Sequence, residues 1–189
     1  MKTGKYIARL KAAIKKYFEE IDLIESERIE LDKRKKDYSQ SYLDSKDKDF
    51  QTREIVIKDM TLEKVQALKE EFFQAVDEWE TPRGEMLDTE DLKLLQGYLT
   101  LSEKEIQALG EKHIDNPIMQ RALKEYAAKN DLYFYLKHDG NDIKAAYNLI
   151  HTTVERGINK PNEYSGMLIK NEKYFDDMVS KQKALTYNE

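Results

Sequence analysis

Histidines are the first side chains to consider for metal binding or acid–base chemistry in this chain. The three histidines are His113, His138 and His151, and none lies in an H-E-x-x-H motif or a similar ligand spacing. His113 is expected near a helix end, where an imidazolium suits the helix dipole. His138 falls in a turn, and His151 borders an apolar stripe. Structural roles explain these histidines, so we expect no metal site and no cofactor.

Carboxylates and glycines give no catalytic pattern either. Asp139, Asn141 and Asp142 surround Gly140 as in a calcium loop, but the ligand spacing and the closing glutamate are absent, so the segment is interpreted as a turn. The sequence contains no Gly-rich phosphate loop and no G-x-S-x-G motif. Acidic residues number 37 among 189, so pairs of carboxylates arise throughout by chance. We predict no enzymatic activity and no catalytic residue.

The composition indicates an elongated helical protein. Apolar residues make up 40% and charged residues 37%, which is more charge and less core than a typical globule has. The 12 Tyr and 6 Phe argue against wholesale disorder, and only 7 Gly and 3 Pro leave room for long elements. Cysteine is absent, so no disulfide framework is expected. Without a signal-peptide pattern at the start or ~20 consecutive apolar residues, we expect a cytoplasmic protein with no membrane contact.

The net charge of −5 is unevenly distributed. Residues 1–16 are basic and contain no acid, whereas residues 70–91 are strongly acidic. These two regions could attract each other between subunits, meet separate partners, or simply be solvated faces. The basic side chains that we consider for docking a partner are Lys5, Arg9, Lys11, Lys15 and Lys16.

The strongest structural signal is a heptad frame in the first 43 residues. The apolar stripe consists of Ile7, Leu10, Ile14, Tyr17, Ile21, Ile24 and Leu31. Arg28 fills the missing slot, and the frame continues through Lys35, Tyr38 and Tyr42. A helix of ~40 residues is about 60 Å long. The stripe must therefore contact another chain or a second long helix folded back, and we assign it to self-association through a coiled coil, with an intramolecular bundle as the alternative.

A charged hinge is predicted after this helix. DSKDKD at 44–49 interrupts the heptad frame, and EIVIK at 54–58 is strand-like. LYFYL at 132–136 is the other strand-like run, so the two could form a short two-stranded ribbon. The chain is thereby divided into a coiled-coil helix at 1–43, a hinge with an extended segment at 44–58, and a helical domain at 59–189.

Helix start and stop signals divide the last part of the chain. Ser102 and Glu105 match a capping box, and Asn116-Pro117 combines an N-cap with proline at the first helical position. Helices are expected at about 61–80, 89–98, 102–110, 117–130, 141–156 and 163–185. The predicted fold class is all-α.

The run LTLSEKEIQALGEKHIDNPIMQRALKEYAAKN, residues 99–130, resembles a segment of proteins from the structural gene clusters of tailed phages and prophages of low-GC Gram-positive bacteria. The resemblance lies in the capped helix, the DNPIMQRALKEYA start of the next helix and the Lys/Asn/Tyr-rich style, and it covers about a sixth of the chain. No catalytic or binding residue is carried over from it.

The resemblance implies a capsid scaffolding protein. Proteins of that family are typically acidic, helical, elongated and cysteine-poor; they dimerise through coiled coils and bind the inner face of coat subunits by weak, charge-dependent contacts. Many end in a basic helical clamp, whereas residues 170–189 have balanced charge here. The basic N-terminal helix is therefore the candidate for binding a coat protein.

We predict a non-catalytic phage structural protein of the scaffolding type, a dimer or larger homo-oligomer that docks a coat or other virion protein. One alternative is another virion component, namely a core, connector or minor head protein, which would stay in the mature particle.

The other alternative is a DNA-binding regulator that uses the helical hairpin at 102–130. The second helix of this hairpin offers Gln120, Arg121, Lys124 and Lys129. The first contributes Glu103, Glu105 and Glu111. Because phosphate binding needs a net positive docking face, nucleic acid is not an expected partner.

Overall fold

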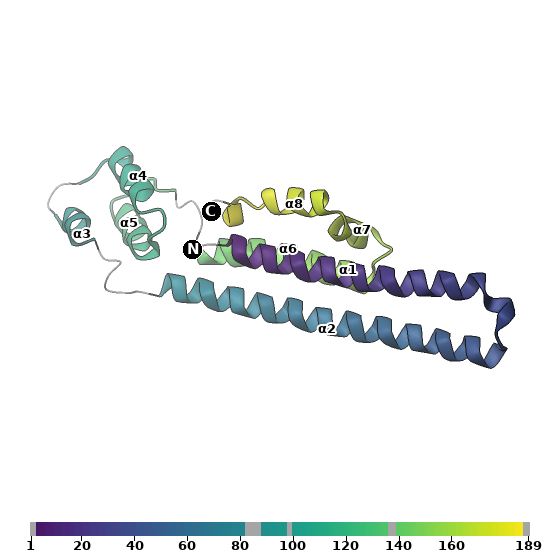
Figure 1. Ribbon diagram of the computed structural model, residues 1–189. Coiled ribbons are helices and arrows are strands. Elements are labelled where there is room, and N and C mark those ends of the chain that lie inside the picture. The colour runs from purple at the N-terminus through teal and green to yellow at the C-terminus, as the bar shows by residue number, and fades with distance from the viewer. Residues whose placement is uncertain (1–2, 82–87, 98–99, 136–138, 187–189) are drawn as a thin grey trace.

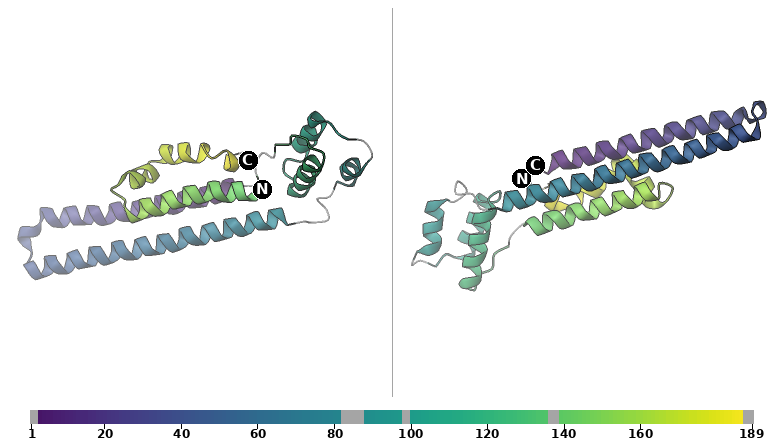
Figure 2. Two further views of the ribbon diagram at one scale, coloured as in Figure 1. Left: turned by 180° about the vertical axis from the view of Figure 1, so that it is seen from behind. Right: turned by 90° about the horizontal axis from the view of Figure 1, so that it is seen from below.

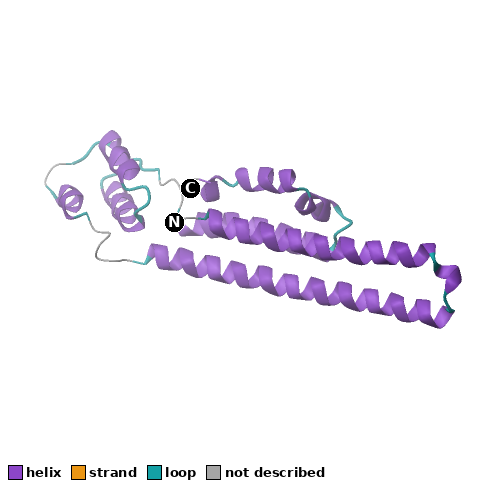
Figure 3. Cartoon of the chain, in the orientation of Figure 1, coloured by secondary structure: helices purple, strands orange, loops and turns teal. Residues whose placement is uncertain are grey.

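The computed structural model describes residues 3–81, 88–97, 100–135 and 139–186. Within these ranges all regular elements are helices, which confirms the all-α class (Figures 1 and 3). The elements are α1 (Gly4–Lys33), η1 (Lys35–Asp37), α2 (Gln40–Glu80), α3 (Thr89–Gln96), α4 (Glu103–Lys112), α5 (Pro117–Lys129), α6 (Gly140–Asn159), α7 (Tyr164–Lys170), α8 (Glu172–Ser180) and α9 (Lys183–Thr186). Among the helices so described, none combines the length and apolar character that crossing a membrane requires.

The two longest helices, α1 and α2, form an antiparallel hairpin (Figure 1). The first helix was predicted to reach residue 43, but it ends at Lys33 and the chain reverses through residues 34–39. Ser39 then caps α2, because its side chain accepts a hydrogen bond from the amide of Tyr42. The 41 residues of α2 run back along α1 and extend past its beginning.

The predicted hinge and extended segment at 44–58 are wrong, since this whole stretch belongs to α2. Side-chain pairs one helical turn apart, such as Gln40 with Asp44 and Gln51 with Asp47, support the helix through its charged part. Ile57 packs against the core, so tertiary contact outweighs the β-propensity of EIVIK. Its proposed ribbon partner is irregular over 132–135, and Leu136 lies outside the described residues.

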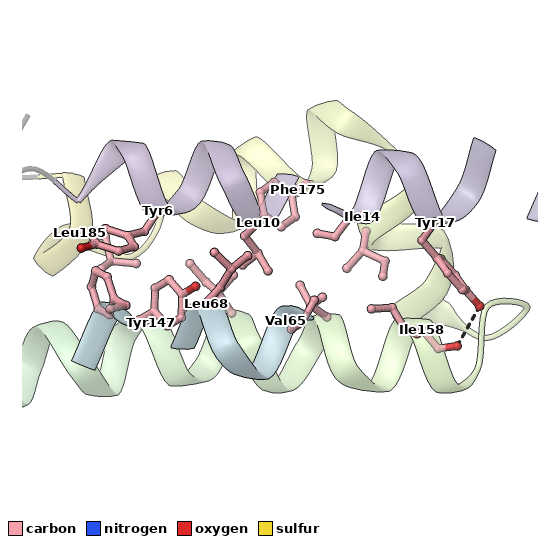
Figure 4. Packing of buried hydrophobic residues seen from close by; sticks show 14 of the residues in the cluster. Tyr6, Leu10, Ile14, Tyr17, Val65, Leu68, Tyr147, Ile158, Phe175 and Leu185 are labelled. Carbon is pink, nitrogen blue, oxygen red and sulfur yellow. Dashed lines mark hydrogen bonds between the residues drawn. The ribbon is translucent and has the colours of Figure 1, made fainter. Parts of the chain in front are cut away.

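The core lies where α1 and the second half of α2 meet α6 and the C-terminal helices (Figure 4). Phe72 of α2 is at its centre: its ring stacks on Tyr147 at 4.1 Å between centroids and meets the edge of Tyr6 at 5.2 Å. Tyr17 donates a hydrogen bond to the carbonyl oxygen of Ile158 at 3.0 Å. These contacts join three helices that are far apart in sequence into one bundle.

The C-terminal helices close the bundle on one side of the hairpin (Figure 2). Helix α6 is antiparallel to α2, and Glu80 at the end of α2 accepts a hydrogen bond from the amide of Gly140 at 2.9 Å. The single helix predicted at 163–185 is three short helices, because Asn171 ends α7 and caps α8 through the amide of Tyr174. Helix α6 continues to Asn159, beyond its predicted end at 156, and Gly157 within it is buried against Ile169, with no room for a Cβ atom.

Helices α3, α4 and α5 form a smaller group at the end of the hairpin opposite the 34–39 turn (Figure 1). The predicted capping box is confirmed: Ser102 accepts from the amide of Glu105, and the Glu105 carboxylate accepts from the amide of Ser102 at 2.8 Å. The predicted N-cap is confirmed as well, since Asn116 accepts from the amide of Met119 with Pro117 in the first turn.

Replacing Phe72 by alanine should lower the free energy of unfolding by about 3–5 kcal/mol, because a fully buried ring at the centre of the bundle is removed. Urea denaturation followed by circular dichroism measures this. Tyr174→Ala is the control, since Tyr174 is 56% exposed and its loss should change stability by ~0.5 kcal/mol or less. A Phe72→Ala variant as stable as the wild type would contradict the packing described.

Candidate interaction surface on the helical hairpin

The apolar stripe predicted to mediate self-association lies inside the chain. Four of its residues are buried, namely Leu10, Ile14, Tyr17 and Ile24. Ile7 and Ile21 pack on the same core at its edge, and Leu31 is half-buried. Leu10 and Ile24 expose none of their surface, so a second chain cannot touch them unless the hairpin opens. The stripe was predicted to pack between two chains, with an intramolecular bundle as the alternative. The structure has the intramolecular arrangement, in which α2 folds back and takes the place of a partner helix.

The basic residues of α1 do not gather into one docking patch. Arg9 pairs with Glu71 of α2, the closest oxygen lying 2.5 Å from its guanidinium. Lys11 bridges Glu172 at 2.7 Å and Asp176 at 2.9 Å on α8. Attraction between the basic start and the acidic middle was considered between subunits, and one such pair, Arg9 with Glu71, is made within the chain.

The other basic candidates are exposed or paired along α1 itself. Lys15 and Lys16 pair with the acids four residues later, and Lys5 lies over the ring of Tyr6, 4.7 Å from its centroid.

One face of the hairpin, here called the open face, remains exposed among the described residues. It runs along both helices through Arg9, Ala12, Lys16, Leu23, Glu27, Arg53, Val56, Met60, Ala67 and Glu71. Helical spacings of three, four and seven keep these residues on the side of the hairpin that is marked by its Arg9–Glu71 and Glu27–Arg53 ion pairs. Helices α6–α9 pack on the opposite side.

The open face carries a small apolar patch among charges. Leu23 is 57% exposed, Val56 49% and Met60 65%. Leu23 lies one turn from Glu27, Val56 one turn from Arg53, and Met60 one turn further along α2. Large apolar side chains at such exposure are ordinary when single, but a group of three on one face indicates a contact surface. The sequence analysis missed this patch because it assigned Val56 to a strand and searched only the heptad stripe.

The distal part of the hairpin is fixed by a short polar cluster around Phe50, which is 4% exposed. The guanidinium groups of Arg28 and Arg53 lie over this ring, at 5.5 and 6.0 Å from its centroid. Arg28 also pairs with Glu54 at 2.9 Å, and Arg53 holds the pKa of Glu27 below its usual value. The two helices therefore stay paired beyond the point where α6 and α7 end (Figure 1).

A separate group of titratable side chains connects α3 to the end of α4. Asp91 Oδ2 lies 2.5 Å from His113 Nε2 and 2.6 Å from Lys112 Nζ. Asp88 Oδ2 lies 3.4 Å from the same ammonium and 3.9 Å from the imidazole. This Asp–His–Lys cluster contains the carboxylates and the imidazole whose arrangement suits a metal ion.

Hydrogen bonds keep the carboxylates of this cluster ionised. Backbone amides, that of Asp91 first, lower the pKa of Asp88, and the hydrogen bond from Lys112 lowers the pKa of Asp91. From the sequence, His113 was considered without its partners Asp88 and Asp91. The available signal was an Asp-x-x-Asp pair at one helix start, followed by Lys-His at the end of the next helix.

The hairpin considered for DNA binding is α4–α5. Gln120, one of its candidate base-reading side chains, is buried and donates a hydrogen bond to the carbonyl oxygen of Gly110 at 2.5 Å. Arg121, Lys124 and Lys129 are exposed basic residues of α5. Glu125 lies among them, and α4 contributes further acidic side chains.

No protein-family model, curated protein or solved structure matches this chain.

His151 of α6 is a buried group outside both sites. It exposes none of its surface, and no hydrogen bond of ordinary geometry reaches either ring nitrogen, although Glu155 lies 3.4 Å from Nδ1 and the backbone of Val65 adjoins the ring. Burial lowers the pKa of His151 below 6.5; Glu155 opposes this shift and Lys69 of α2 reinforces it. Nearby, burial raises the pKa of Tyr147 to about 12. Both groups fill the core as neutral side chains.

The protein should lose stability as pH falls through the range in which an unfolded histidine protonates. The folded-state pKa of His151 is lowered, so below pH ~6.5 the unfolded chain binds a proton that the folded chain does not, until the folded pKa is passed. His151→Leu should reduce this loss. Urea unfolding at about pH 7.5 and about pH 5.5 measures it. An equal loss in the variant and the wild type would show that other groups cause the pH dependence.

Proposed function

We propose that this chain is a non-catalytic assembly protein of the phage scaffolding type, which acts in the host cytoplasm. In this proposal it associates with a second copy of itself through the open face of the hairpin. It also docks a coat or other virion protein through weak, charge-dependent contacts. The resemblance of residues 99–130 to phage structural-cluster proteins supports the phage origin. The observation that carries the self-association is the complementarity of the open face with itself.

Three ion pairs fix which residues of α1 and α2 are level along the hairpin. Arg9 pairs with Glu71, Glu27 with Arg53, and Arg28 with Glu54. In this register the exposed Leu23 of α1 is level with the exposed Val56 and Met60 of α2. Nearer the core end, Ala12 is level with Ala67, and both are exposed.

A two-fold axis along the hairpin would place α1 of one copy over α2 of the other without changing these levels. Leu23 would then face the Val56 and Met60 of the second copy, twice. The exposed alanines would let the helices approach closely, within the 8–10 Å typical of packed helices. Such an isologous contact repeats each favourable pair, as closed dimers do.

Charge is complementary in the same arrangement. The α1 side of the open face is basic towards its start, with Lys5, Arg9 and Lys16, and at the same level the α2 side carries Glu63, Glu71 and Glu78. The basic strip of each copy would therefore lie over the acidic strip of the other. Arg9 and Glu71 already pair within one chain. In the dimer, each would also lie close to the oppositely charged residue of the second copy.

The small apolar patch suits an assembly that must later come apart. Three apolar side chains surrounded by charges form a weak contact, because the apolar area is small and exposed ion pairs contribute little. The contact is also sensitive to salt, because dissolved ions screen the exposed charges. Many such contacts together can hold a shell during assembly. Once one contact has formed, linked neighbours bind at a high effective concentration, so the overall affinity exceeds that of any single contact. A scaffold needs this combination of collective strength and individual weakness.

Met60→Glu should weaken self-association by about tenfold or more, since a charge replaces an apolar contact at the centre of the patch. Light scattering coupled to size exclusion, over several protein and salt concentrations, measures the effect. Met60 is 65% exposed, so folding should be unchanged. Met167→Glu is the matched control, because Met167 of α7 is 62% exposed and lies outside the open face.

A wild-type chain that stays at the monomer mass of 22.3 kDa at every concentration would contradict the proposed dimer. The phage role is tested separately, by co-expression with the coat protein encoded in the same gene cluster. Closed shells that later lose this chain are expected of a scaffold. A chain retained in mature particles would instead indicate a core, connector or minor head protein.

A further inference from the structure

We propose that Asp88, Asp91 and His113 form a binding site for a divalent transition-metal ion of the Zn²⁺ class, with Lys112 as a competing internal cation. The site lies where the start of α3 meets the end of α4, away from the hairpin, and does not depend on the proposed self-association. One ligand atom from each of the three residues lies within 4.8 Å of the others.

The local structure holds two of the three ligands in place. Asp88 is the N-cap of α3, and its Oδ1 accepts hydrogen bonds from the amides of Glu90 and Asp91, each at 3.1 Å. Its Oδ2 is left to face the cluster. Asp91 lies one turn further along α3, so helical spacing brings the two carboxylates to one side.

Burial separates this cluster from an ordinary group of surface charges. Asp91 is 6% exposed and His113 8% exposed, and they come from different helices. An aspartate is almost never buried to this extent unless it is paired or binds a metal, and Asp91 has Lys112 and His113 as its partners in this structure. An imidazole nitrogen with two carboxylate oxygens is a ligand set that Zn²⁺ uses in proteins, with a remaining position for water.

The observed distances are close to those a bound ion requires. Two ligand atoms about 2.1 Å from a tetrahedral ion lie roughly 3.4 Å apart. The imidazole Nε2 lies 2.5 Å from Asp91 Oδ2 and 3.9 Å from Asp88 Oδ2, so the values bracket that spacing. Moving His113 Nε2 and Asp91 Oδ2 apart by about an ångström would bring that pair to the spacing of ligands on one ion.

Lys112 explains how the cluster is stable without a metal. Its ammonium lies 2.6 Å from Asp91 and neutralises one of the two negative charges. The Lys112 side chain is 55% exposed, so it can move into solvent when an ion enters. A divalent ion would then balance both carboxylates, which a single ammonium does not.

The first test is calorimetric titration of the full chain with ZnCl₂ after treatment with a chelator and buffer exchange. The wild type should bind one Zn²⁺ per chain, and its thermal midpoint should rise, because an ion that binds only the folded state stabilises it. Co²⁺ should bind in competition with Zn²⁺ and produce the visible absorption of a low-symmetry site. Mg²⁺, which prefers oxygen ligands, should not displace either ion.

Three variants test which residues bind the ion. Asp88→Asn should weaken Zn²⁺ binding about tenfold or more while preserving the fold, because asparagine caps a helix as well as aspartate does. Lys112→Met should strengthen binding several-fold, because the competing cation is removed. Asp139→Asn is the matched control: it makes the same change at the N-cap of α6, and should leave binding unchanged.

The proposal is overturned if neither the wild type nor Lys112→Met binds Zn²⁺, or if Asp88→Asn binds it as tightly as the wild type. In those cases the cluster is a buried ion-pair network in which Lys112 is the resident cation. Lys112→Met would then lower the thermal midpoint without creating a Zn²⁺ site. None of these outcomes bears on the dimer, which is measured with Met60→Glu.

Discussion

The packing of α2 against α1 is the interaction on which the rest of the structure depends. Either helix alone would expose an apolar stripe along much of its length, and an isolated amphipathic helix gains little stability from its backbone alone. Folding back buries both stripes at once and brings Phe72 between Tyr6 of α1 and Tyr147 of α6. Helix α6 packs on the surface that α1 and α2 form together.

This arrangement divides the hairpin into two unlike faces. One is covered by α6 and the C-terminal helices and is apolar, with Val65, Phe72 and Val76 buried along α2. The other is marked by ion pairs and carries the exposed patch of Leu23, Val56 and Met60. Charged side chains around Phe50 hold α1 and α2 together near the 34–39 turn, so this part of the hairpin stays paired without contact from α6.

The polar groups of the chain are used in two different ways. His151 and Tyr147 are buried without full hydrogen bonding and stay neutral, so they add bulk to the core at an electrostatic cost. Asp91 and His113 are buried as partners of each other, Asp91 also pairs with Lys112, and these contacts connect α3 to the end of α4. The first arrangement leaves two titratable groups buried in the core, and the second concentrates donor atoms where α3 meets the end of α4.

The sequence by itself determined the helical class, the capped starts at Ser102 and Asn116, and the burial of Leu10, Ile14, Tyr17 and Ile24 in α1, because these depend on local hydrogen bonds and on the helical period. The burial of Tyr6, Ala13 and Phe18 in the same helix was not predicted. Only the tertiary structure decided what covers the stripe of α1. A period of 3.6 marks a buried face but is the same for a partner chain and a folded-back helix. The turn at 34–39 has no glycine or proline to mark it, and EIVIK became helical through contacts made by Ile57. The joining of Asp88 and Asp91 to His113 likewise depends on how α3 and α4 both pack on α5, which no local pattern specifies.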